Sequence, residues 1–491
     1  METSDALALV DRIYQRLAAR RGEIEKAERY YEGDQPLHFA TAEWRKANAA
    51  RYSGFSDNWC GTVVNAEAER LKPIGFELPD GGSGAGLWDQ LQMNEFDAQF
   101  SQGVVTALTA KRTYAIVWPD GDGDSLVSFE HPSYVEIEYD WENPRRRAAA
   151  LKTWLDDEFE YATLYTPTEL WKFRRARSTQ ANVSDPLSVQ AASSAAGGSA
   201  EWVAREVAGE VWPLPNPLGE VPVVEIGNRP RLKGEPVSEI AGVMPMQDAI
   251  NLLWAYLFLA ADYASMDARV MLGSNPPKIP ILDSSGKIVG ERPVEMQDLR
   301  EKRLLSLTGD NAKIDSWQAA RLDVFTDTIE IAVGHIAAQT RTPPHYLVTN
   351  KGISNLSGDA LKSAEIGLTK KAGEFITFTD PQIREVVRLV ALVKGEKDLA
   401  RQARLAKVRW ESPEIRSEAQ LVDALQKKAT VGWPFELLLE EYGKSPKEIK
   451  RILDMREREV EQAIGAGVQS AIQDGMNDVG EVDSAESPGI A

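Results

Sequence analysis

Apolar and charged positions alternate at helical spacing near the start of the chain. The apolar positions are Leu9, Ile13, Leu17, Ile24 and Ala27. Because residues three or four apart share a helix face, the pattern predicts one helix over residues 4–32. Gly33 can adopt the left-handed conformation that ends a helix, and Pro36 prevents the helix from resuming. Tyr30 and Tyr31 point about 100° apart on such a helix, so we expect one to pack inward and the other to meet a neighbouring segment or subunit.

The hydrophobic period becomes strand-like between residues 112 and 175. Strands are expected over residues 113–118, 125–129, 134–139, 148–154, 161–165 and 169–173, as an antiparallel meander. The Asp-Gly-Asp-Gly-Asp stretch at 120–124 is predicted to be a hairpin turn. An EF-hand loop would need glycine and glutamate where this chain has Ser125 and His131. Residues 178–198 have few large apolar side chains and are predicted to be a mobile insertion.

The second half of the chain is predicted to be mostly helical, which makes the expected fold class α+β with helices predominant. Expected helices cover residues 236–263, 318–339, 357–393, 417–429, 434–441 and 446–466, and residues 86–110 are also expected to be helical. Ser357 and Asp359 supply capping chemistry for the third of these, and a bend is expected at 380–381. Residues 264–317 are expected to form a compact insertion that contains a hairpin, and residues 469–491 a frayed tail.

Composition narrows the classes of protein that remain. The chain has 491 residues, 43% hydrophobic residues and a net charge of −19. This charge argues against tight, sequence-independent wrapping of DNA, which needs many Lys and Arg side chains. The single cysteine, Cys60, excludes an intrachain disulfide framework, and the acidic start at 1–5 predicts no signal peptide. The apolar run at 249–261 is shorter than the ~20 residues that cross a bilayer and contains Asn251, so we expect a helix buried against other helices and no membrane span.

Catalytic and metal-binding motifs are missing from the sequence. There is no H-E-x-x-H, C-x-x-C or G-x-S-x-G. Gly443-Lys444-Ser445 resembles the end of a Walker A loop, but Leu438 stands at the first glycine position. The four histidines lack metal-ligand spacing, and His335 is predicted to be a packed or interface residue. We therefore predict a protein that is not an enzyme, with no catalytic residues, cofactor or metal.

The order of elements resembles that of the portal proteins of tailed bacteriophages, in the branch with long, flexible tails (siphophage-type). The motif Arg-Tyr-Tyr-Glu-Gly-Asp-Gln-Pro-Leu at 29–37 is similar to the Tyr-Tyr-x-Gly element after the family's first helix. The stretch from Asn58 to Phe76 is similar to the segment that leads into the wing sheet. Most specific is Ile353-Ser-Asn-Leu-Ser-Gly-Asp-Ala-Leu-Lys362, which resembles the Asn-x-Ser-Gly-x-Ala-Leu pattern at the start of the helix after the tunnel loop. The resemblance spans almost the whole chain.

The resemblance implies a ring, usually of twelve subunits, around a channel for double-stranded DNA at one capsid vertex. It assigns residues 1–235 to the wing, 236–263 to the first stem helix, 264–317 to the clip, 318–342 to the second stem helix, 343–356 to the tunnel loop, 357–412 to the long wing helix and the segment after it, 413–468 to the crown and 469–491 to a flexible tail. Implied partners are the terminase large subunit, the major capsid and scaffold proteins and a head–tail adaptor. The implied location is the virion, after assembly in the cytoplasm of a bacterial host.

Residues of the tunnel loop are the expected contacts to DNA. They are Asn350, Lys351, Ser354 and Asn355. The acidic character of the chain fits this picture, because a channel that neutralised many phosphates would hold DNA in place. An exposed loop with no role in DNA binding is the alternative for these residues. For the whole chain, the alternatives are a non-viral helical scaffold or adaptor that assembles through the same apolar helices, and an enzyme with degenerate motifs.

Overall fold

The computed structural model describes most of the chain, in two units. The described residues are 1–35, 55–79, 84–121, 123–176, 201–265, 269–272, 278–293, 313–316, 321–347, 358–414, 418–444 and 446–481. Unit 1 comprises Met1–Gln35, Asn58–Pro245 and His335–Ala491, and unit 2 comprises Pro36–Asp57 and Met246–Gly334. Antiparallel sheets and helices are both present, so the expected α+β class is confirmed.

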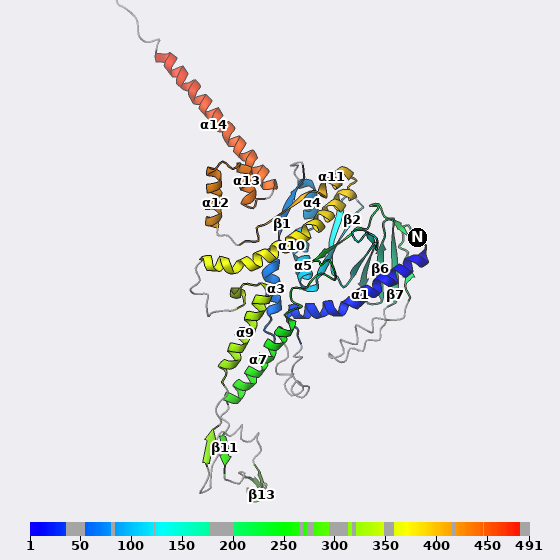
Figure 1. Ribbon diagram of the computed structural model, residues 1–491, viewed down its shortest axis with the longest axis vertical. Coiled ribbons are helices and arrows are strands. Elements are labelled where there is room, and N and C mark those ends of the chain that lie inside the picture. Colours follow the sequence, from blue (N-terminus) through cyan, green and yellow to red (C-terminus); the bar gives the residue numbers. More distant parts are fainter. Residues whose placement is uncertain are drawn as a thin grey trace, which may run out of the picture. The chain divides into compact units, whose positions relative to one another are not determined.

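Two antiparallel sheets form the β-structure at the centre of unit 1 (Figure 1). The smaller sheet has the order β10-β2-β3, from Val223–Gly227, Arg112–Pro119 and Ser125–Glu130. The larger sheet has the order β4-β5-β6-β7-β8, with β9 also paired to β7. Its strands are Val135–Tyr139, Arg147–Leu155, Phe159–Tyr165, Glu169–Ala176, Val203–Ala204 and, for β9, Leu214–Pro215. The expected antiparallel meander is confirmed for the β2–β3 hairpin and for β4 to β7, but it is divided between two sheets, because β3 and β4 are not paired. The second neighbour of β2 is β10, from much later in the chain.

Helix α1 (Thr3–Glu32) packs along the larger sheet. Its apolar face and the sheet share one core cluster, made of Ala6, Val10, Ile13, Tyr14, Leu17, Ala149, Leu151, Ala162, Leu164, Trp171, Phe173 and Trp202. Full burial of a Leu, Ile or Val side chain stabilises the fold by about 1.5–3 kcal/mol. The helix that the sequence predicts is confirmed, and its apolar stripe faces a sheet.

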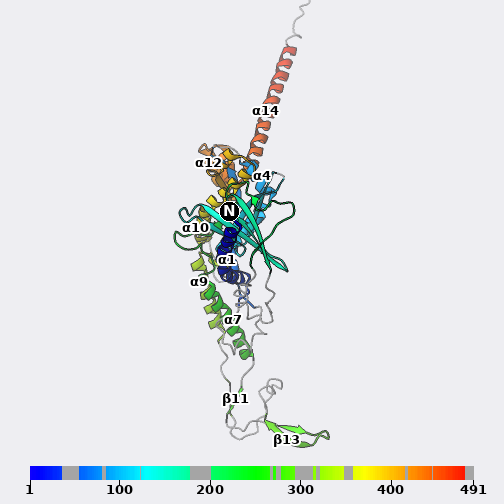
Figure 2. The ribbon, with the colours of Figure 1, turned by 90° about the vertical axis from the view of Figure 1, so that its right-hand side faces the viewer.

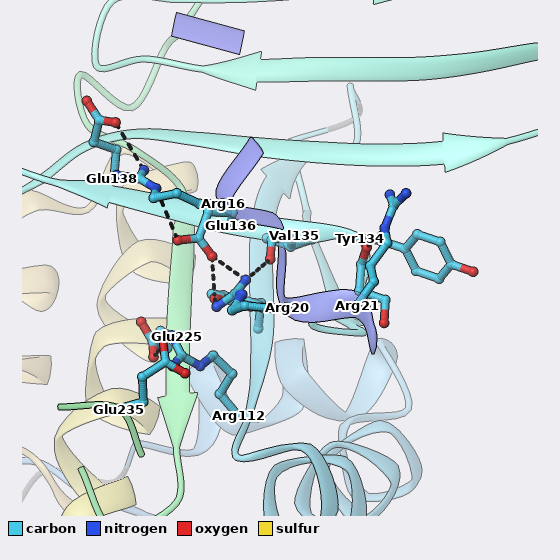
Figure 3. A network of polar contacts seen from close by, with 12 residues as sticks. Arg16, Arg20, Arg21, Arg112, Tyr134, Val135, Glu136, Glu138, Glu225 and Glu235 are labelled. Carbon is cyan, nitrogen blue, oxygen red and sulfur yellow. Dashed lines mark hydrogen bonds and ion pairs between the residues drawn. The ribbon is translucent and has the colours of Figure 1, made fainter. Parts of the chain in front are cut away.

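Arginines on α1 form ion pairs with carboxylates on β4 beside that core (Figure 3). Arg16 and Arg20 both reach Glu136, and Arg16 also reaches Glu138 at 3.0 Å. Burial raises the pKa of Glu136, and the positive charges of Arg20, Arg112 and Arg16 offset part of that rise. Charge pairing thus sets the position of α1 along the strand, while burial of the apolar face supplies most of the free energy that stabilises the packing of α1 on the sheet.

Gly33 ends α1 with a left-handed backbone, φ 85°. A Cβ at this position would lie 3.2 Å from the side-chain nitrogen of Asn58, which donates to the carbonyl of Tyr31. The side-chain oxygen of Asn58 accepts from the backbone N–H of Cys60 and so caps the next helix, α3 (Trp59–Ala68). Tyr30 is buried, and the hydroxyl of Tyr31 donates to Asn65 on α3 at 3.0 Å. Both expectations for the tyrosine pair are confirmed.

The helical structure expected over residues 86–110 is confirmed, with one break. The chain forms α4 (Ala85–Met93) and α5 (Phe96–Ala110), separated by Glu95 in a left-handed conformation with φ 54°. The side chain of Asn94 bonds to the backbone of Val127 and Ser125 on β3, which stabilises the break. Strand β1 (Pro73–Glu77) pairs with β15 (Lys407–Trp410), a partner that the sequence does not predict.

The C-terminal part of unit 1 is helical. Its elements are the 3-10 helix η1 (Pro344–Tyr346), α10 (Gly358–Val393), α11 (Lys397–Ala403), α12 (Glu418–Thr430), α13 (Phe435–Glu441) and α14 (Pro446–Glu481). Pro381 lies inside α10, which continues past it to the predicted end at residue 393. The expectation of a frayed tail from residue 469 is wrong up to residue 481, because α14 remains helical to that point.

Unit 2 contains the helices α7 (Met244–Ser265) and α9 (Asp323–Thr340), which continue into unit 1 at one end and run alongside each other in both views (Figures 1 and 2). Strands β12 (Lys278–Leu282) and β13 (Ile288–Pro293) form the expected hairpin, and β11 (Arg269–Leu272) pairs with β14 (Lys313–Ser316). Both helices begin later than predicted. For α7, the segment before the helix is held by other contacts: residues 237 and 239 donate their backbone N–H groups to the carbonyls of Asn228 and Leu108.

The apolar run on α7 is covered within unit 2 by residues 55–57. The indole of Trp254 donates to Asp57 at 2.7 Å, and Phe55 packs edge-on against both Trp254 and Phe258. Asn251 accepts from the backbone N–H of Asp57 at 3.0 Å. Within the described part of the chain, every helix is too short or too polar to cross a membrane.

Candidate functional site

The expected DNA contacts lie outside the described residues, but both ends of their segment are described. Asn350, Lys351, Ser354 and Asn355 fall between Leu347, which follows η1, and Gly358, which begins α10. Residues 178–198 also lie outside the described part. The described residues show how the two ends of the 348–357 segment are held in place. The contacts that hold them are ion pairs along α10.

The first cluster joins the two ends of the 348–357 segment. Glu365, on the second turn of α10, pairs with Arg70 at 2.5 Å and with His345 of η1 at 2.7 Å. Arg70 also donates to the hydroxyl of Tyr346 at 3.0 Å and to the carbonyl of Pro413 at 2.9 Å. We call Arg70, His345, Tyr346 and Glu365 the loop anchor. Because Arg70 is almost fully buried, these contacts fix the position of both segment ends relative to α3 and to the chain that leads to α12.

The second cluster is centred on Lys371, which is 1% exposed. Its ammonium lies 2.8 Å from Glu67 on α3 and 2.6 Å from Glu239, in the segment before α7. Glu239 also accepts from Asn228 at 2.7 Å and pairs with Arg229 at 2.6 Å. Burial raises the pKa of Glu67 to about 7, and the charge of Lys371 limits that rise. Two positive and two negative groups thus meet in a space from which water is excluded.

The third cluster connects the second half of α10 to the larger sheet. Arg388 forms ion pairs with Glu385, one turn earlier, and with Glu220. Arg147 on β5 reaches the same two carboxylates, at 2.5 Å and 3.2 Å. Burial alone would raise the pKa of Glu385, but hydrogen bonds from Arg388 and the charge of Arg147 outweigh burial and lower it. Helix α10 is therefore fastened by ion pairs at three levels, each to a different segment of the chain.

A pH dependence follows from the raised pKa of Glu67. An unfolded glutamate titrates near 4.3, so between that value and about 7 the folded chain holds a proton that the unfolded chain has lost. Stability from this group is full at low pH and is lost as the pH rises through 7, with a slope of at most about 1.4 kcal/mol per pH unit. We expect Glu67→Gln to flatten the decrease in unfolding free energy between pH 5 and 7 in urea titrations. An unchanged slope would contradict this assignment.

The described histidines serve as ion-pair partners or face solvent. His345 pairs with Glu365 and His131 pairs with Glu28. His335 is exposed on α9, so the expectation that it packs in a core is wrong, while its role at an interface stays a prediction. Among the described residues, no group of three or more His, Cys, Asp or Glu side chains is placed to hold a metal ion.

Sequence reasoning missed the members of all three clusters. Arg70, Lys371 and Arg388 have partners that lie far away in sequence; the hydrogen bond from Arg70 to Glu365 spans 295 positions. One signal was available, a lysine at 371 on the apolar face of a predicted helix between Leu368 and Phe375. A cation at such a position requires a buried partner.

Comparison with known proteins provides a family assignment. Residues 10–462 match the family described as "Phage portal protein, SPP1 Gp6-like". The portal protein of Mycobacterium phage D29 is 28% identical over 381 residues, covering 74% of this chain and 70% of its own length. The portal protein of Mycobacterium phage L5 is 26% identical over 430 residues, covering 84% and 80%.

Solved structures are similar at lower identity. The neck of the native gene transfer agent (GTA) particle, computed with C12 symmetry, has a chain that is 11% identical with a TM-score of 0.41; the alignment covers 83% of this chain and 92% of that one. A chain in the virion of the native particle is 10% identical with a TM-score of 0.36, covering 79% and 88%. The family match extends over most of the sequence, and this chain belongs to the SPP1 Gp6-like family of phage portal proteins.

Proposed function

We propose that this chain forms a closed ring at one vertex of a phage capsid and that genome DNA enters and leaves through the ring. As a member of the portal family, the chain is a structural component of the virion and not an enzyme. The proposed partners are the terminase large subunit during packaging, then a head–tail adaptor, with major capsid and scaffold proteins around the wing. A ring of twelve subunits is proposed, and no membrane or cofactor is involved.

The architecture supports a division of the chain into wing, stem, clip, tunnel loop and crown. Unit 2 includes most of residues 236–342, the proposed stem helices and clip. The sheets of unit 1 belong to the proposed wing, residues 1–235, and α12 to α14 belong to the proposed crown. The long α10 connects these parts, because it begins after the proposed tunnel loop and its ion pairs reach α3, β5 and the segment before α7.

The observation that carries the proposal is the family match over residues 10–462. The loop anchor adds a physical reason why a DNA-contacting loop belongs between residues 347 and 358. A loop that touches moving DNA needs ends that do not move with it, and the pairs of Glu365 with Arg70 and His345 supply fixed ends.

The proposal is tested by the oligomeric state and shape of the purified chain. We expect native mass spectrometry to find one closed oligomer and negative-stain images to show a ring with a central hole. Co-expression with the scaffold protein is the second arm, because assembly is often assisted. A monomer or dimer in both arms would reject the ring and favour the scaffold or adaptor alternative.

The charge at position 351 is expected to affect DNA packaging and not ring assembly. Lys351→Glu places a carboxylate where we propose phosphates pass, so repulsion should reduce packaging in vitro about tenfold while rings still assemble. Lys370→Glu, a reversal at an exposed position of α10, is the matched control and should package normally. Packaging that is equal in the two variants would remove Lys351 from the proposed DNA contacts.

A further inference from the structure

The larger sheet of unit 1 carries a row of aromatic and arginine side chains on the face opposite α1. Trp154 of β5, Tyr161 of β6 and Arg174 of β7 are cross-strand neighbours, and Val203 of β8 follows Arg174 in the same row. Successive side chains of a strand point to opposite faces, and the adjacent positions on these strands belong to the core shared with α1. The smaller sheet covers the same face further along β5, where Ala150 is fully buried. At the row itself, the two rings are only half-buried, and the other two side chains are exposed.

Two guanidinium groups lie over the rings of this face. Arg205, which follows β8, lies 5.4 Å from the ring centroid of Trp154 and 5.0 Å from that of Tyr161. Arg174 lies 5.0 Å from the ring centroid of Phe159. Neither arginine forms an ion pair with a described carboxylate, and the buried Nε of Arg205 has no hydrogen-bond partner among the described residues. We call Trp154, Phe159, Tyr161, Arg174 and Arg205 the arginine face. Because guanidinium groups bind both π faces and carboxylates, this face suits a ligand that combines an aromatic ring with a carboxylate.

The turn between β4 and β5 presents such a combination. Trp141 is 87% exposed, and Glu142, the next residue, is exposed as well. The turn has a fixed shape, because the backbone N–H of Asp140 donates to the carbonyl of Arg146 at 2.8 Å and the backbone N–H of Glu142 donates to the carboxylate of Asp140 at 2.9 Å. A tryptophan held outward on a fixed turn loses little conformational entropy when it binds, which is typical of the residues that dominate interfaces. We call residues 140–146 the tryptophan turn.

The tryptophan turn and the arginine face lie at opposite ends of β5. The turn leads into Arg147, the first residue of the strand, and Trp154 is the last residue but one. At ~3.3 Å per residue, these two positions are about 23 Å apart. The turn therefore cannot reach the arginine face of its own copy, and both surfaces are available to other copies.

We propose that the tryptophan turn of one copy docks on the arginine face of a second copy, with the indole of Trp141 over the guanidinium of Arg205 and the carboxylate of Glu142 paired with Arg174. An interface that uses two different surfaces is heterologous; it joins each copy to two neighbours and closes into a ring if the rotation fits. The inference rests on the proposed ring and names one contact within it.

Both surfaces carry charges of both signs, so the match lies in the groups that meet and not in net charge. The other charged groups are Arg145 and the Asp140–Arg146 pair on the turn, and, next to the arginine face, the Lys172–Glu210 pair, Asp156, Asp157, Glu158 and Glu206. The carboxylate of Asp156 accepts from the hydroxyl of Tyr161 at 2.6 Å.

Cysteine cross-linking tests this contact directly. A chain that carries Arg145→Cys on the turn and Val203→Cys beside Arg174 is treated with a bis-maleimide after assembly; the natural Cys60 is buried. Because each copy is joined to two neighbours, we expect a ladder of covalent species above the dimer. A mixture of the two single variants should give dimers at most. Arg145→Cys with Leu232→Cys, a fully exposed position outside the sheets, is the matched control and should give no ladder.

Substitutions on the two surfaces provide the second measurement. Trp141→Ala should weaken each subunit contact about tenfold in a native mass spectrometry dilution series, whereas Leu232→Ala, which also removes an exposed apolar side chain, should have no effect. Both variants should keep the urea midpoint of the unmodified chain, because exposed side chains contribute little to folding. Glu142→Arg and Arg174→Glu should each weaken assembly about tenfold, and a chain that carries both should regain most of the loss.

The outcomes separate this contact from the ring. Rings of the double cysteine variant in negative stain without a covalent ladder overturn the proposed contact and leave the ring standing. Absence of any oligomer in the unmodified chain, with and without scaffold protein, rejects the ring and the contact together. Trp141→Ala rings that are as stable as those of the unmodified chain but fail to enter capsids assign Trp141 to the capsid shell and also overturn the proposal.

Discussion

Replacing Lys371 with methionine is expected to lower the free energy of unfolding by about 3–5 kcal/mol, the usual cost of breaking a buried ion pair by removing one partner. Methionine fits the space but leaves Glu67 and Glu239 buried without the ammonium that lies 2.8 Å and 2.6 Å from them. The change should appear as a lower urea midpoint with an unchanged slope.

Lys370→Met is the matched control, because Lys370 is the exposed neighbour on the same helix and should change stability by less than about 0.5 kcal/mol. Protonation of Glu67 removes a buried charge that has lost its ammonium partner, while Glu239 keeps its pair with Arg229, so the deficit of Lys371→Met should shrink as the pH falls through the raised pKa of Glu67. Equal effects of the two methionine variants, or a deficit that grows in acid, would show that the cluster is not the electrostatic centre described above.

Replacing Arg70 with methionine is expected to abolish DNA packaging while rings still form. The substitution removes the hydrogen bonds to Tyr346 and Pro413 and the partner of Glu365, which frees both ends of the 348–357 segment from α3. The thermodynamic cost is about 2–3 kcal/mol, since a buried carboxylate loses its main donor. Packaging of a defined DNA in vitro and negative-stain imaging of the same preparation are the two measurements.

The variant Arg70→Lys tests whether the loop anchor depends on the positive charge of Arg70 or on the geometry of its guanidinium group. Lysine keeps the positive charge, but its three N–H donors radiate from one nitrogen and cannot reach acceptors that the two terminal guanidinium nitrogens of Arg70 meet separately. We expect stability close to that of the unmodified chain and packaging that is still reduced. If Arg70→Met packages normally while its unfolding free energy falls, then the loop anchor only stabilises the fold and has no part in DNA passage.

Elements that depend on local pattern were predictable from the sequence. Helix α1, its end at Gly33, the strands between 112 and 176 and the hairpin at 120–124 follow from periodicity and turn chemistry, which act over a few residues. Errors occurred where a tertiary contact overrides the local preference. Asn94 and Glu95 break a good helical pattern because Asn94 bonds to β3. Residues 237 and 239 lie outside α7, with their backbone N–H groups bonded to Asn228 and Leu108.

The candidate site was predictable only in part. The motif at 353–362 located the start of α10 and hence the segment of the expected DNA contacts, which stay predictions. The ion-pair clusters were not predictable, because no local rule connects Arg70 with Glu365 or Glu67 with Lys371. A charged residue on an apolar helix face indicates that it has a buried partner, but only the folded structure identifies that partner.

The long sequence separation of these pairs has a consequence for synthesis. Strand β1 pairs with β15, and Arg70 reaches Pro413, a contact that spans 343 positions. On the ribosome, Glu67 and Glu239 emerge well before Lys371, so Glu67 lacks its ammonium partner and Glu239 has only Arg229 as a cation until α10 has been made. Contacts of such high sequence separation form slowly because loop closure precedes any stabilising energy. On a ribosome stalled before residue 371, the nascent chain should therefore be incompletely packed and sensitive to protease. Newly finished chains should need time to fold before they can join a ring.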